Sequence, residues 1–583
     1  MSSVPPSRSA ALLRAAPVDA GGAPMGTGPT GTAPTDAGTA PTSGAPTGAG
    51  TAPTDAGAAP AGTAPTGAAP TGVAGGAPSG SAFRDGASYP ETSYPETSYP
   101  ETSYPEASYP EYEVHAYIDG HFEPASAQWI PVLDKAAGVP FGRYTNSSAE
   151  QVDRAVTAAS RAQPDWAAAS FTTRSAILRA FARELEVRHD ELIALIIRET
   201  GGTAEKAEEE LGQSITQLLN SATQLTENAG DILPPYKQGK LSLSRAVPLG
   251  VIGLIVPWNY PMSLAMRALA PGLAYGNAVV LKPAELTPIA GGQILAEAAR
   301  AAGVPAGVFS VVPGDGDGTG QALVHHPGLD LIHFTGSGAV GRQIAAAAAV
   351  SLRPAALELG GDNAFVVLAD ADIDRAASCA VWSALWYQGQ TCISAGRHIV
   401  ARSAAKAFTE AVVDRVSRLR VGDPLREDVD LGPVISERQL ARFHDEMVLP
   451  SIAAGARVAV GAAHDGLFYT PTVLTDVTPE MPVFTEEIFG PVMPITVVDT
   501  EEDALTLVNR HHSMMNSVFT RDPMRGLDFA SRIASSEVHV NDGYARHGGE
   551  GQQRAFTRRQ WIGVQTADVP YPAWAESRLP EQH

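Results

Sequence analysis

Apolar residues recur at the spacing of helices between residues 149 and 227. From residue 117 onward, hydrophobic side chains return every three or four positions over long stretches, as expected of helices that bury one face. The predicted helices are Ala149–Ala168, Thr173–Glu199 and Ala204–Glu227.

Short apolar runs follow these helices and predict buried strands. The predicted strands are Gly250–Val256, Ala278–Leu281, Val308–Val312, Leu331–Phe334 and Ala364–Leu368. Helical stretches such as Gly292–Ala302 and Gly338–Ala348 separate them. Strand and helix in alternation predict an α/β fold with a parallel sheet covered on both faces. Ligands of such sheets bind at the carboxyl ends of the strands, so we expect an enzyme with a nucleotide-type crevice.

The first 115 residues show neither the helical spacing of apolar residues nor the short apolar runs. Residues 22–80 are almost wholly Gly, Ala, Pro and Thr, and Ser-Tyr-Pro-Glu then repeats every five residues from Ser88 to Glu111. With so few large aliphatic side chains, burial cannot offset a backbone ordering cost of about 1–2 kcal/mol per residue. We expect residues 1–115 to form a disordered tail. The repeated tyrosines fit either a solvating spacer or a docking segment for a partner that the sequence does not identify.

Charge and cysteine content exclude several classes of protein. The chain has 41 Lys and Arg against 63 Asp and Glu, a net charge of −22, whereas a nucleic-acid binder needs a basic face. Its two cysteines exclude a disulfide scaffold. No uninterrupted apolar run reaches the ~18 residues of a membrane helix, and the N-terminus lacks the apolar core of a signal peptide. We expect a soluble, cytoplasmic protein without a nucleic-acid or membrane partner.

Two residues are candidates for catalysis. Cys392 lies among small and polar neighbours in Gly-Gln-Thr-Cys-Ile, which fits an accessible nucleophile, although a single cysteine is more often an inert apolar residue. Glu358 lies in Leu-Glu-Leu-Gly-Gly, where apolar surroundings would raise the pKa of a carboxylate to suit a general base. A glutamate that faces water at a strand end fits that pattern equally well.

Two further motifs directly follow predicted strands. In Pro-Trp-Asn-Tyr-Pro, residues 257–261, the Asn259 amide is placed to donate to an oxyanion, or the segment is an ordinary turn rich in Pro and Asn. Gly-Ser-Gly-Ala-Val-Gly, residues 336–341, opens a predicted helix whose free backbone N–H groups suit a phosphate. No set of His, Asp, Glu and Cys has metal-ligand spacing, so no metal site is expected.

The order of six motifs identifies a resemblance to a known family. Along the chain come Pro-Trp-Asn-Tyr-Pro (257–261), Lys-Pro-Ala-Glu (282–285), Phe-Thr-Gly-Ser (334–337), Leu-Glu-Leu-Gly-Gly (357–361), Gly-Gln-Thr-Cys (389–392) and Glu-Ile-Phe-Gly-Pro-Val (487–492). Their order and spacing closely resemble the aldehyde dehydrogenase superfamily over residues 117–572. The resemblance implies a Rossmann-type NAD-binding domain, an α/β catalytic domain and a small β arm that forms a homodimer or homotetramer.

The same resemblance implies how the chain divides. After the tail come an NAD-binding domain over residues 116–358, with an arm segment near 230–246, and a catalytic domain over residues 359–541. Residues 542–583 are expected to form the C-terminal arm and tail.

The resemblance also implies roles for individual residues. Cys392 would be the nucleophile, Asn259 and the Cys392 backbone N–H would bind the oxyanion, and Glu358 would activate the water that hydrolyses a thioester. The implied cofactor site has Lys282 and Glu285 at the adenine ribose, Ser337 at the pyrophosphate, Glu487 and Phe489 at the nicotinamide end, and Trp258, Gly336 and Gly341 beside them. NAD is expected over NADP because the Glu285 carboxylate would repel a 2′-phosphate.

The resemblance extends to a possible substrate class. Met266–Pro271 and Phe556–Pro572 resemble the benzaldehyde and vanillin dehydrogenase branch, which predicts an aromatic or otherwise bulky aldehyde. Trp386 and Tyr387 are expected to line an aromatic mouth. Arg267 stands where semialdehyde dehydrogenases bind a carboxylate, so a carboxylated aldehyde is the alternative.

One departure from the family follows Asn541. A loop that helps to wall the aldehyde tunnel in relatives is missing there, and Met514-Met515 replaces their Gly-Leu. The gap predicts a wide mouth that tolerates bulky aldehydes, or a weakly active or inactive homologue.

Overall fold

The computed structural model describes residues 111–125, 127–225, 230–235, 239–543 and 555–565. Most of the predicted tail, residues 1–110, and the segment of the predicted missing loop, residues 544–554, lie outside these ranges. No described helix is both long and apolar enough to cross a membrane.

The folded part begins earlier than the sequence predicted. Strand β1 (Tyr112–Val114) pairs in parallel with β5 (Pro140–Tyr144), which also pairs with β4 (Ile130–Leu133). Val114 is completely buried, and Glu113 forms an ion pair with Arg143. The tail boundary at residue 115 is therefore wrong, because residues 112–115 belong to the fold.

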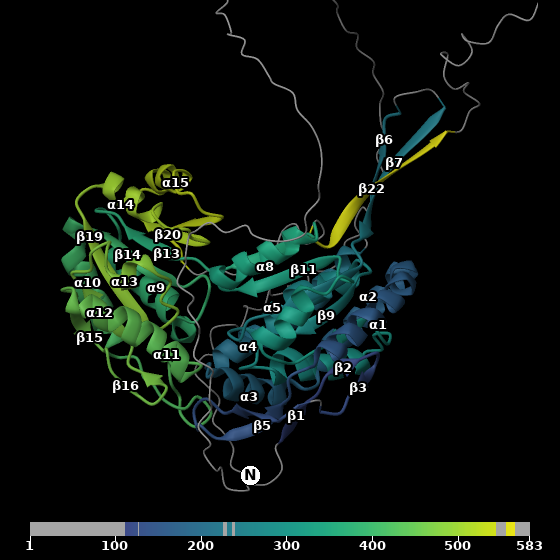
Figure 1. Cartoon of the computed structure of the whole chain (residues 1–583). Coiled ribbons are helices and arrows are strands. Elements are labelled where there is room, and N and C mark those ends of the chain that lie inside the picture. The colour runs from purple at the N-terminus through teal and green to yellow at the C-terminus, as the bar shows by residue number, and fades with distance from the viewer. Residues whose placement is uncertain (1–110, 126, 226–229, 236–238, 544–554, 566–583) are drawn as a thin grey trace, which may run out of the picture. The chain divides into compact units, whose positions relative to one another are not determined.

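A seven-stranded sheet forms the first half of the fold (Figure 1). Its order is β12-β11-β8-β9-β10-β2-β3, and the five strands from β12 to β10 are parallel. The bounds are β2 (Tyr117–Ile118), β3 (His121–Phe122), β8 (Val251–Ile255), β9 (Ala278–Lys282), β10 (Phe309–Val311), β11 (Leu331–Gly336) and β12 (Ala355–Leu359). The predicted border after residue 358 falls inside β12.

Continuous apolar runs form these strands because both faces of the sheet are covered. In β9, Val279 and Leu281 pack into one core, whereas Ala278 and Val280 pack into the other. Helices α2 to α6 contribute to the first core, and α1, α7 and α8 to the second. Their bounds are α1 (Ala149–Ala168), α2 (Phe171–Glu186), α3 (His189–Thr200), α4 (Ala204–Gln224), α5 (Pro261–Ala274), α6 (Ile294–Ala301), α7 (Gln321–Val324) and α8 (Gly338–Val350).

One predicted helix is in fact two. The stretch predicted as Thr173–Glu199 breaks between α2 and α3, where Arg188 leaves helical geometry at φ −101° and ψ 17°. Its guanidinium pairs with Glu191 and with Glu297 of α6. Both helices bury an apolar stripe in the same core, so the hydrophobic spacing runs through the break without marking it.

A second seven-stranded sheet carries the C-terminal half of the fold, in the order β15-β18-β19-β14-β13-β20-β21. Helices α9 (Ile373–Leu385) and α10 (Arg402–Val416) pack on one face. The strands are β13 (Asn363–Val367), β14 (Ala395–Ala401), β15 (Arg457–Val460), β18 (Thr472–Thr475), β19 (Val492–Val498), β20 (Met515–Phe519) and β21 (Glu537–Val540). The other face carries α11 (Glu437–Phe443), α12 (Leu449–Ala453), α13 (Pro482–Thr485), α14 (Glu501–Val508) and α15 (Pro523–Ser531).

The two predicted arm segments pair with each other. Strands β6 (Gly230–Leu233) and β7 (Lys240–Pro248) form an antiparallel sheet with β22 (Thr557–Gln565), with β7 in the middle (Figure 1). Ile232 is 78% exposed and Trp561 is 63% exposed. The sheet therefore exposes large apolar side chains to solvent.

Candidate active site

Cys392 lies in the connection between α9 and β14, and Asn363 holds this connection in place. The Asn363 side-chain amide donates to the carbonyl oxygens of Cys392, at 2.8 Å, and of Ser394, at 3.0 Å. The amide oxygen of Asn363 accepts from the backbone N–H groups of Met514 and Met515, each at 3.0 Å. One buried asparagine thus ties the cysteine to the start of β20.

The chain immediately before Cys392 is strained. Tyr387 and Gln388 have positive φ values of 52° and 56°, a left-handed geometry that costs residues other than glycine about 1–3 kcal/mol. The Gln388 amide donates to the carbonyl oxygens of Gly201 and Pro433, each at 2.8 Å. Contacts from distant segments therefore fix the approach to Cys392.

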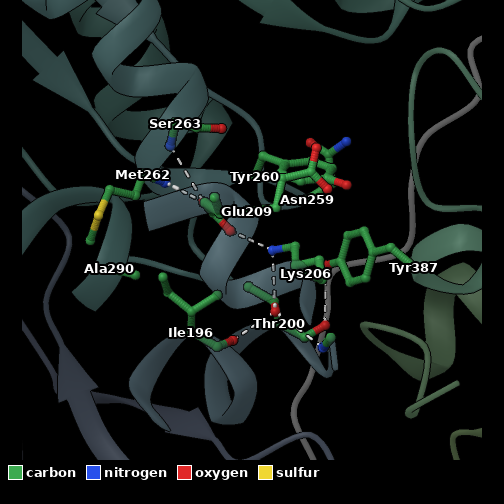
Figure 2. Close-up of polar contacts among 12 residues, drawn as sticks. Ile196, Thr200, Lys206, Glu209, Asn259, Tyr260, Met262, Ser263, Ala290 and Tyr387 are labelled. Atoms are coloured by element: carbon green, nitrogen blue, oxygen red, sulfur yellow. Dashed lines mark hydrogen bonds and ion pairs between the residues drawn. The ribbon is translucent and has the colours of Figure 1, made fainter. Parts of the chain in front are cut away.

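Tyr387 was expected to line the mouth of the substrate site, but the structure buries it. Its side chain is buried, and its hydroxyl donates to the carbonyl oxygen of Thr200 at 3.2 Å. The positive φ turns this side chain into the protein, where it packs edge-to-face on Tyr260 (Figure 2). Trp386 alone of the two keeps partial exposure, and its indole N–H donates to the Tyr260 hydroxyl at 3.0 Å.

Asn259 reaches the segment that carries Cys392. It lies between β8 and α5, is 3% exposed, and its side-chain N–H donates to the carbonyl oxygen of Gln390 at 3.0 Å. The structure therefore brings the predicted oxyanion donor to within two residues of the predicted nucleophile.

The surroundings of Cys392 keep its sulfur protonated at neutral pH. Burial raises the pKa of the thiol to about 11, and the negative charge of Glu487 acts in the same direction. The positive charge of Arg267 opposes this effect, and Glu358 adds a further small increase. Glu358 and Arg267 thus both lie close enough to act on Cys392 electrostatically.

Of the two environments that the sequence left open for Glu358, the structure shows the partly exposed one at a strand end. It lies in β12, at the end next to the glycines, and its side chain is 40% exposed. The Arg267 guanidinium lies 3.8 Å from its carboxylate. The carboxylate is therefore accessible to water and lies beside a positive charge.

Lys282 and Glu285 lie together at the end of β9. The Lys282 ammonium is 3.8 Å from the Glu285 carboxylate and donates to the carbonyl oxygen of Pro283 at 3.0 Å. Burial lowers the pKa of Lys282, whereas Glu285 raises it. The Glu285 side chain is 42% exposed, which leaves its carboxylate open to a ligand.

The glycine-rich motif opens α8, as the sequence predicted. Gly336 ends β11, and the Ser337 hydroxyl caps α8 by accepting from the backbone N–H of Val340 at 3.4 Å. Gly341 has a packing role, because a Cβ there would lie 2.5 Å from a methyl group of Leu359. Gly341 thus lets α8 approach β12 closely.

Trp258 and Phe489 are in contact although they are 231 positions apart in the sequence. Their rings contact edge-to-face, with centroids 5.5 Å apart. Glu487, two residues before Phe489, is partly buried next to Gly360, and this burial raises its pKa to about 7. One carboxylate oxygen of Glu487 has no hydrogen-bond partner, so it is free to accept from a ligand hydroxyl.

The sequence motifs did not identify every residue that shapes this site. Asn363, Gln388 and Gln390 hold the Cys392 segment through side-chain bonds that no local pattern encodes. The described residues contain no cluster of three or more His, Cys, Asp or Glu able to hold a metal ion.

Comparisons with known proteins identify the family of this chain. A profile described as the aldehyde dehydrogenase family matches residues 121–554. The NAD(+) benzaldehyde dehydrogenase of Pseudomonas putida is 41% identical over 460 residues, which covers 76% of this chain and 94% of that protein. A vanillin dehydrogenase of Amycolatopsis sp. is 36% identical over 473 residues, covering 78% and 97%.

Solved structures of the same family share the fold. The NADP-dependent glyceraldehyde-3-phosphate dehydrogenase from Bacillus halodurans, complexed with NADP, superposes with a TM-score of 0.75 at 31% identity, covering 78% of this chain and 100% of that one. Betaine aldehyde dehydrogenase from Staphylococcus aureus, in complex with NAD, also gives 0.75, at 27% identity, covering 78% and 95%. The chain therefore belongs to the aldehyde dehydrogenase family and is an NAD(P)-dependent oxidoreductase acting on aldehydes.

Proposed function

We propose that this enzyme oxidises aromatic aldehydes to carboxylic acids with NAD, through a thioester on Cys392. The observation that carries the proposal is the bond from Asn259 to the carbonyl oxygen of Gln390, at 3.0 Å. It places an amide donor beside the segment that bears a thiol, as attack on a carbonyl group requires.

The reaction begins when the Cys392 thiol loses its proton to solvent water and the sulfur attacks the aldehyde carbon. Burial raises the thiol pKa to about 11, whereas the positive charge of Arg267 lowers it and so favours the reactive thiolate. The tetrahedral thiohemiacetal carries an oxyanion. The second N–H of the Asn259 amide, which Gln390 does not occupy, and the Cys392 backbone N–H are the donors that stabilise it.

The residues of the proposed cofactor site suit a dinucleotide. The capped N-terminus of α8 suits a pyrophosphate, the Trp258–Phe489 pair offers an aromatic wall, and the orphaned Glu487 oxygen accepts from a ribose hydroxyl. A bound NAD would supply the acceptor for the hydride that leaves the carbon attached to Cys392. The open Glu285 carboxylate would accept from both adenine-ribose hydroxyls and would repel a 2′-phosphate, which favours NAD over NADP.

Glu358 completes the reaction. A thioester resists neutral water, so release of the acid needs a base that activates a water molecule. The 40% exposed carboxylate of Glu358 is open to water and acts electrostatically on Cys392. Hydrolysis then frees the carboxylic acid and restores the thiol.

Aromatic side chains in the segment that precedes Cys392 suit an aromatic aldehyde. Trp386 is joined to Tyr260, and its ring lies 6.2 Å from that of Trp382, which is 43% exposed. The names of the two related proteins, benzaldehyde and vanillin dehydrogenase, point to the same substrate class. The partly exposed Arg267 favours the second candidate, a carboxylated aldehyde.

The arm supports a proposal of a homodimer or homotetramer. Ile232 and Trp561 expose apolar surface on β6 and β22, which association with a second copy would bury.

The test is to mix the purified enzyme with NAD and benzaldehyde and to record NADH absorbance and benzoate formation. We expect multiple turnovers, and we expect none from Cys392→Ala. Absence of NADH from the parent enzyme with benzaldehyde, 4-carboxybenzaldehyde and acetaldehyde would support the reading as an inactive homologue.

A further inference from the structure

A completely buried ion pair lies on α4, outside the residues assigned to the reaction. The Lys206 ammonium contacts the Glu210 carboxylate one helical turn away, and neither side chain is exposed to solvent. Removing two charges from water is costly, and a buried pair is often replaceable by neutral groups without loss of stability. Its presence therefore calls for a role other than stabilising the fold.

Glu210 caps a helix to which it does not belong. One carboxylate oxygen contacts Lys206, and the other accepts from the backbone N–H groups of Met262, at 2.8 Å, and Ser263, at 3.4 Å. These groups open α5, whose own N-cap residue provides no side-chain cap. The first turn of α5 begins two residues after Asn259, so Glu210 fixes the end of the segment that carries the proposed oxyanion donor.

Lys206 lies close to two tyrosine rings, and each tyrosine is near a proposed catalytic residue in the sequence (Figure 2). Its ammonium lies 4.5 Å from the ring centroid of Tyr260 and 4.4 Å from that of Tyr387, within cation–π range. The two rings contact each other with centroids 5.5 Å apart. Tyr260 directly follows Asn259, and Tyr387 lies in the strained turn five residues before Cys392.

Thr200 closes this arrangement from the end of α3. Its hydroxyl lies 3.5 Å from the Lys206 ammonium, and its carbonyl oxygen accepts from the Tyr387 hydroxyl. Burial raises the pKa of Tyr387 well above its usual value, so the hydroxyl remains a donor. The left-handed backbone of Tyr387 is thus held both at its ring and at its hydroxyl.

We propose that Lys206 and Glu210 are positioning residues that set Asn259 and Cys392 relative to each other. Neither touches the substrate: Glu210 fixes the start of α5, and Lys206 locks the Tyr260 and Tyr387 rings together. This inference rests on the roles proposed above for Asn259 and Cys392. An error of about 1 Å between a nucleophile and an oxyanion donor lowers a rate roughly 100-fold, so the pair governs the rate of acylation.

The test is the double variant Lys206→Met/Glu210→Gln. It removes both charges together, keeps side chains of similar length, and retains an amide oxygen that can accept from Met262 and Ser263. The measurements are the rate of the first NADH burst, the dissociation constant for NAD, the melting temperature, and the rate of Cys392 alkylation by iodoacetamide. The control is Arg188→Met/Glu297→Gln, which removes the ion pairs of Arg188, just before α3, with Glu191 and with Glu297 of α6 and contacts no proposed catalytic residue.

We expect the burst rate of the double variant to fall roughly 10- to 100-fold, with KM changed less than kcat. NAD affinity and melting temperature should match the parent enzyme, and the control should behave as the parent in all measurements. A burst rate within twofold of the parent overturns the proposal. A parallel loss of burst rate, NAD affinity and melting temperature also overturns it, because that pattern indicates a purely structural role.

Two further outcomes are distinguishable. If the parent enzyme gives no burst with any aldehyde, the proposed function fails, and the Cys392 alkylation rate then tests positioning alone: a rate unchanged in the double variant overturns it. If the double variant does not fold, Lys206→Gln replaces it. This side chain still donates to Glu210 but carries no charge for the rings, so the same fall in burst rate is expected, and an unchanged rate overturns the proposal.

Discussion

The guanidinium of Arg267 lies 3.8 Å from the carboxylate of Glu358, which joins α5 to the end of β12. Both side chains are about two-fifths exposed, at 44% and 40%, and an ion pair at that exposure contributes about 0–1 kcal/mol to stability. Its consequence is therefore chemical. The same positive charge lowers the pKa of Cys392, so Arg267 acts on both the proposed base and the proposed nucleophile.

The first prediction separates the base from the nucleophile. Glu358→Gln should allow one hydride transfer and then stop, because acylation needs Cys392 whereas deacylation needs the carboxylate. Stopped-flow measurements should show a burst of NADH close to the enzyme concentration and then a slow steady state. Cys392→Ala should show no burst. Undiminished multiple turnover by Glu358→Gln would remove Glu358 from the mechanism.

The second prediction concerns the substrate and uses two aldehydes that differ by one carboxylate. Arg267→Met should slow the acylation of benzaldehyde and 4-carboxybenzaldehyde by the same factor, because it removes the charge that lowers the Cys392 pKa. Arg267→Lys, which keeps the charge, should restore most of both rates. If 4-carboxybenzaldehyde loses about tenfold more in kcat/KM than benzaldehyde, Arg267 binds the substrate carboxylate and the alternative function holds.

Sequence reasoning succeeded where a residue's environment is set by its own segment. The predicted strands became β8, β9, β10, β11 and β13 because a strand covered on both faces must be apolar throughout. Ser337 capped α8 for a similarly local reason, since a serine after a strand satisfies the first N–H groups of the next helix.

Prediction from the sequence was incomplete where contacts with distant parts of the chain set a residue's environment. Tyr387 was expected at the mouth, but its positive φ and the carbonyl oxygen of Thr200 direct it inward. The sequence left two environments open for Glu358, and the one found, partial exposure beside Arg267, depends on another helix. Neither outcome has a local signal, because each depends on a contact between segments far apart in the sequence.

The third prediction follows from the raised pKa of Cys392. A pKa of about 11 means that the sulfur is a thiol at neutral pH, and the thiolate fraction rises about tenfold for each pH unit below that value. Iodoacetamide should therefore alkylate Cys392 faster at each step from pH 7 to pH 10 in the enzyme without NAD. Mass spectrometry distinguishes alkylated Cys392 from alkylated Cys379. Burial also raises the pKa of the Cys379 thiol. A rate that levels off by pH 8 would contradict the raised pKa.

The fourth prediction places the start of the fold. Removal of residues 1–110 should leave activity and melting temperature nearly unchanged, because this segment is poor in large apolar side chains. Removal of residues 1–115 should lower the free energy of unfolding by about 1.5–3 kcal/mol for the loss of buried Val114 alone. Thermal unfolding of the two truncated proteins is the measurement. Equal melting temperatures would show that β1 contributes nothing.

The last prediction concerns the choice of cofactor. Glu285 presents a 42% exposed carboxylate next to the buried Lys282 ammonium, at the carboxyl end of β9. Glu285→Gln removes the charge that repels a 2′-phosphate but keeps a group that can hydrogen-bond to a ribose. The ratio of kcat/KM for NAD to that for NADP should therefore fall about tenfold, through a loss with NAD and a gain with NADP.

The matched control for this change is Glu205→Gln, at an exposed glutamate in the first turn of α4. Both variants lose one negative charge, so a general electrostatic effect on an anionic cofactor would move them equally. A local effect of Glu285 changes the ratio only in Glu285→Gln. If the ratio stays the same in Glu285→Gln, the carboxylate does not meet the adenine ribose, and the preference for NAD must arise elsewhere.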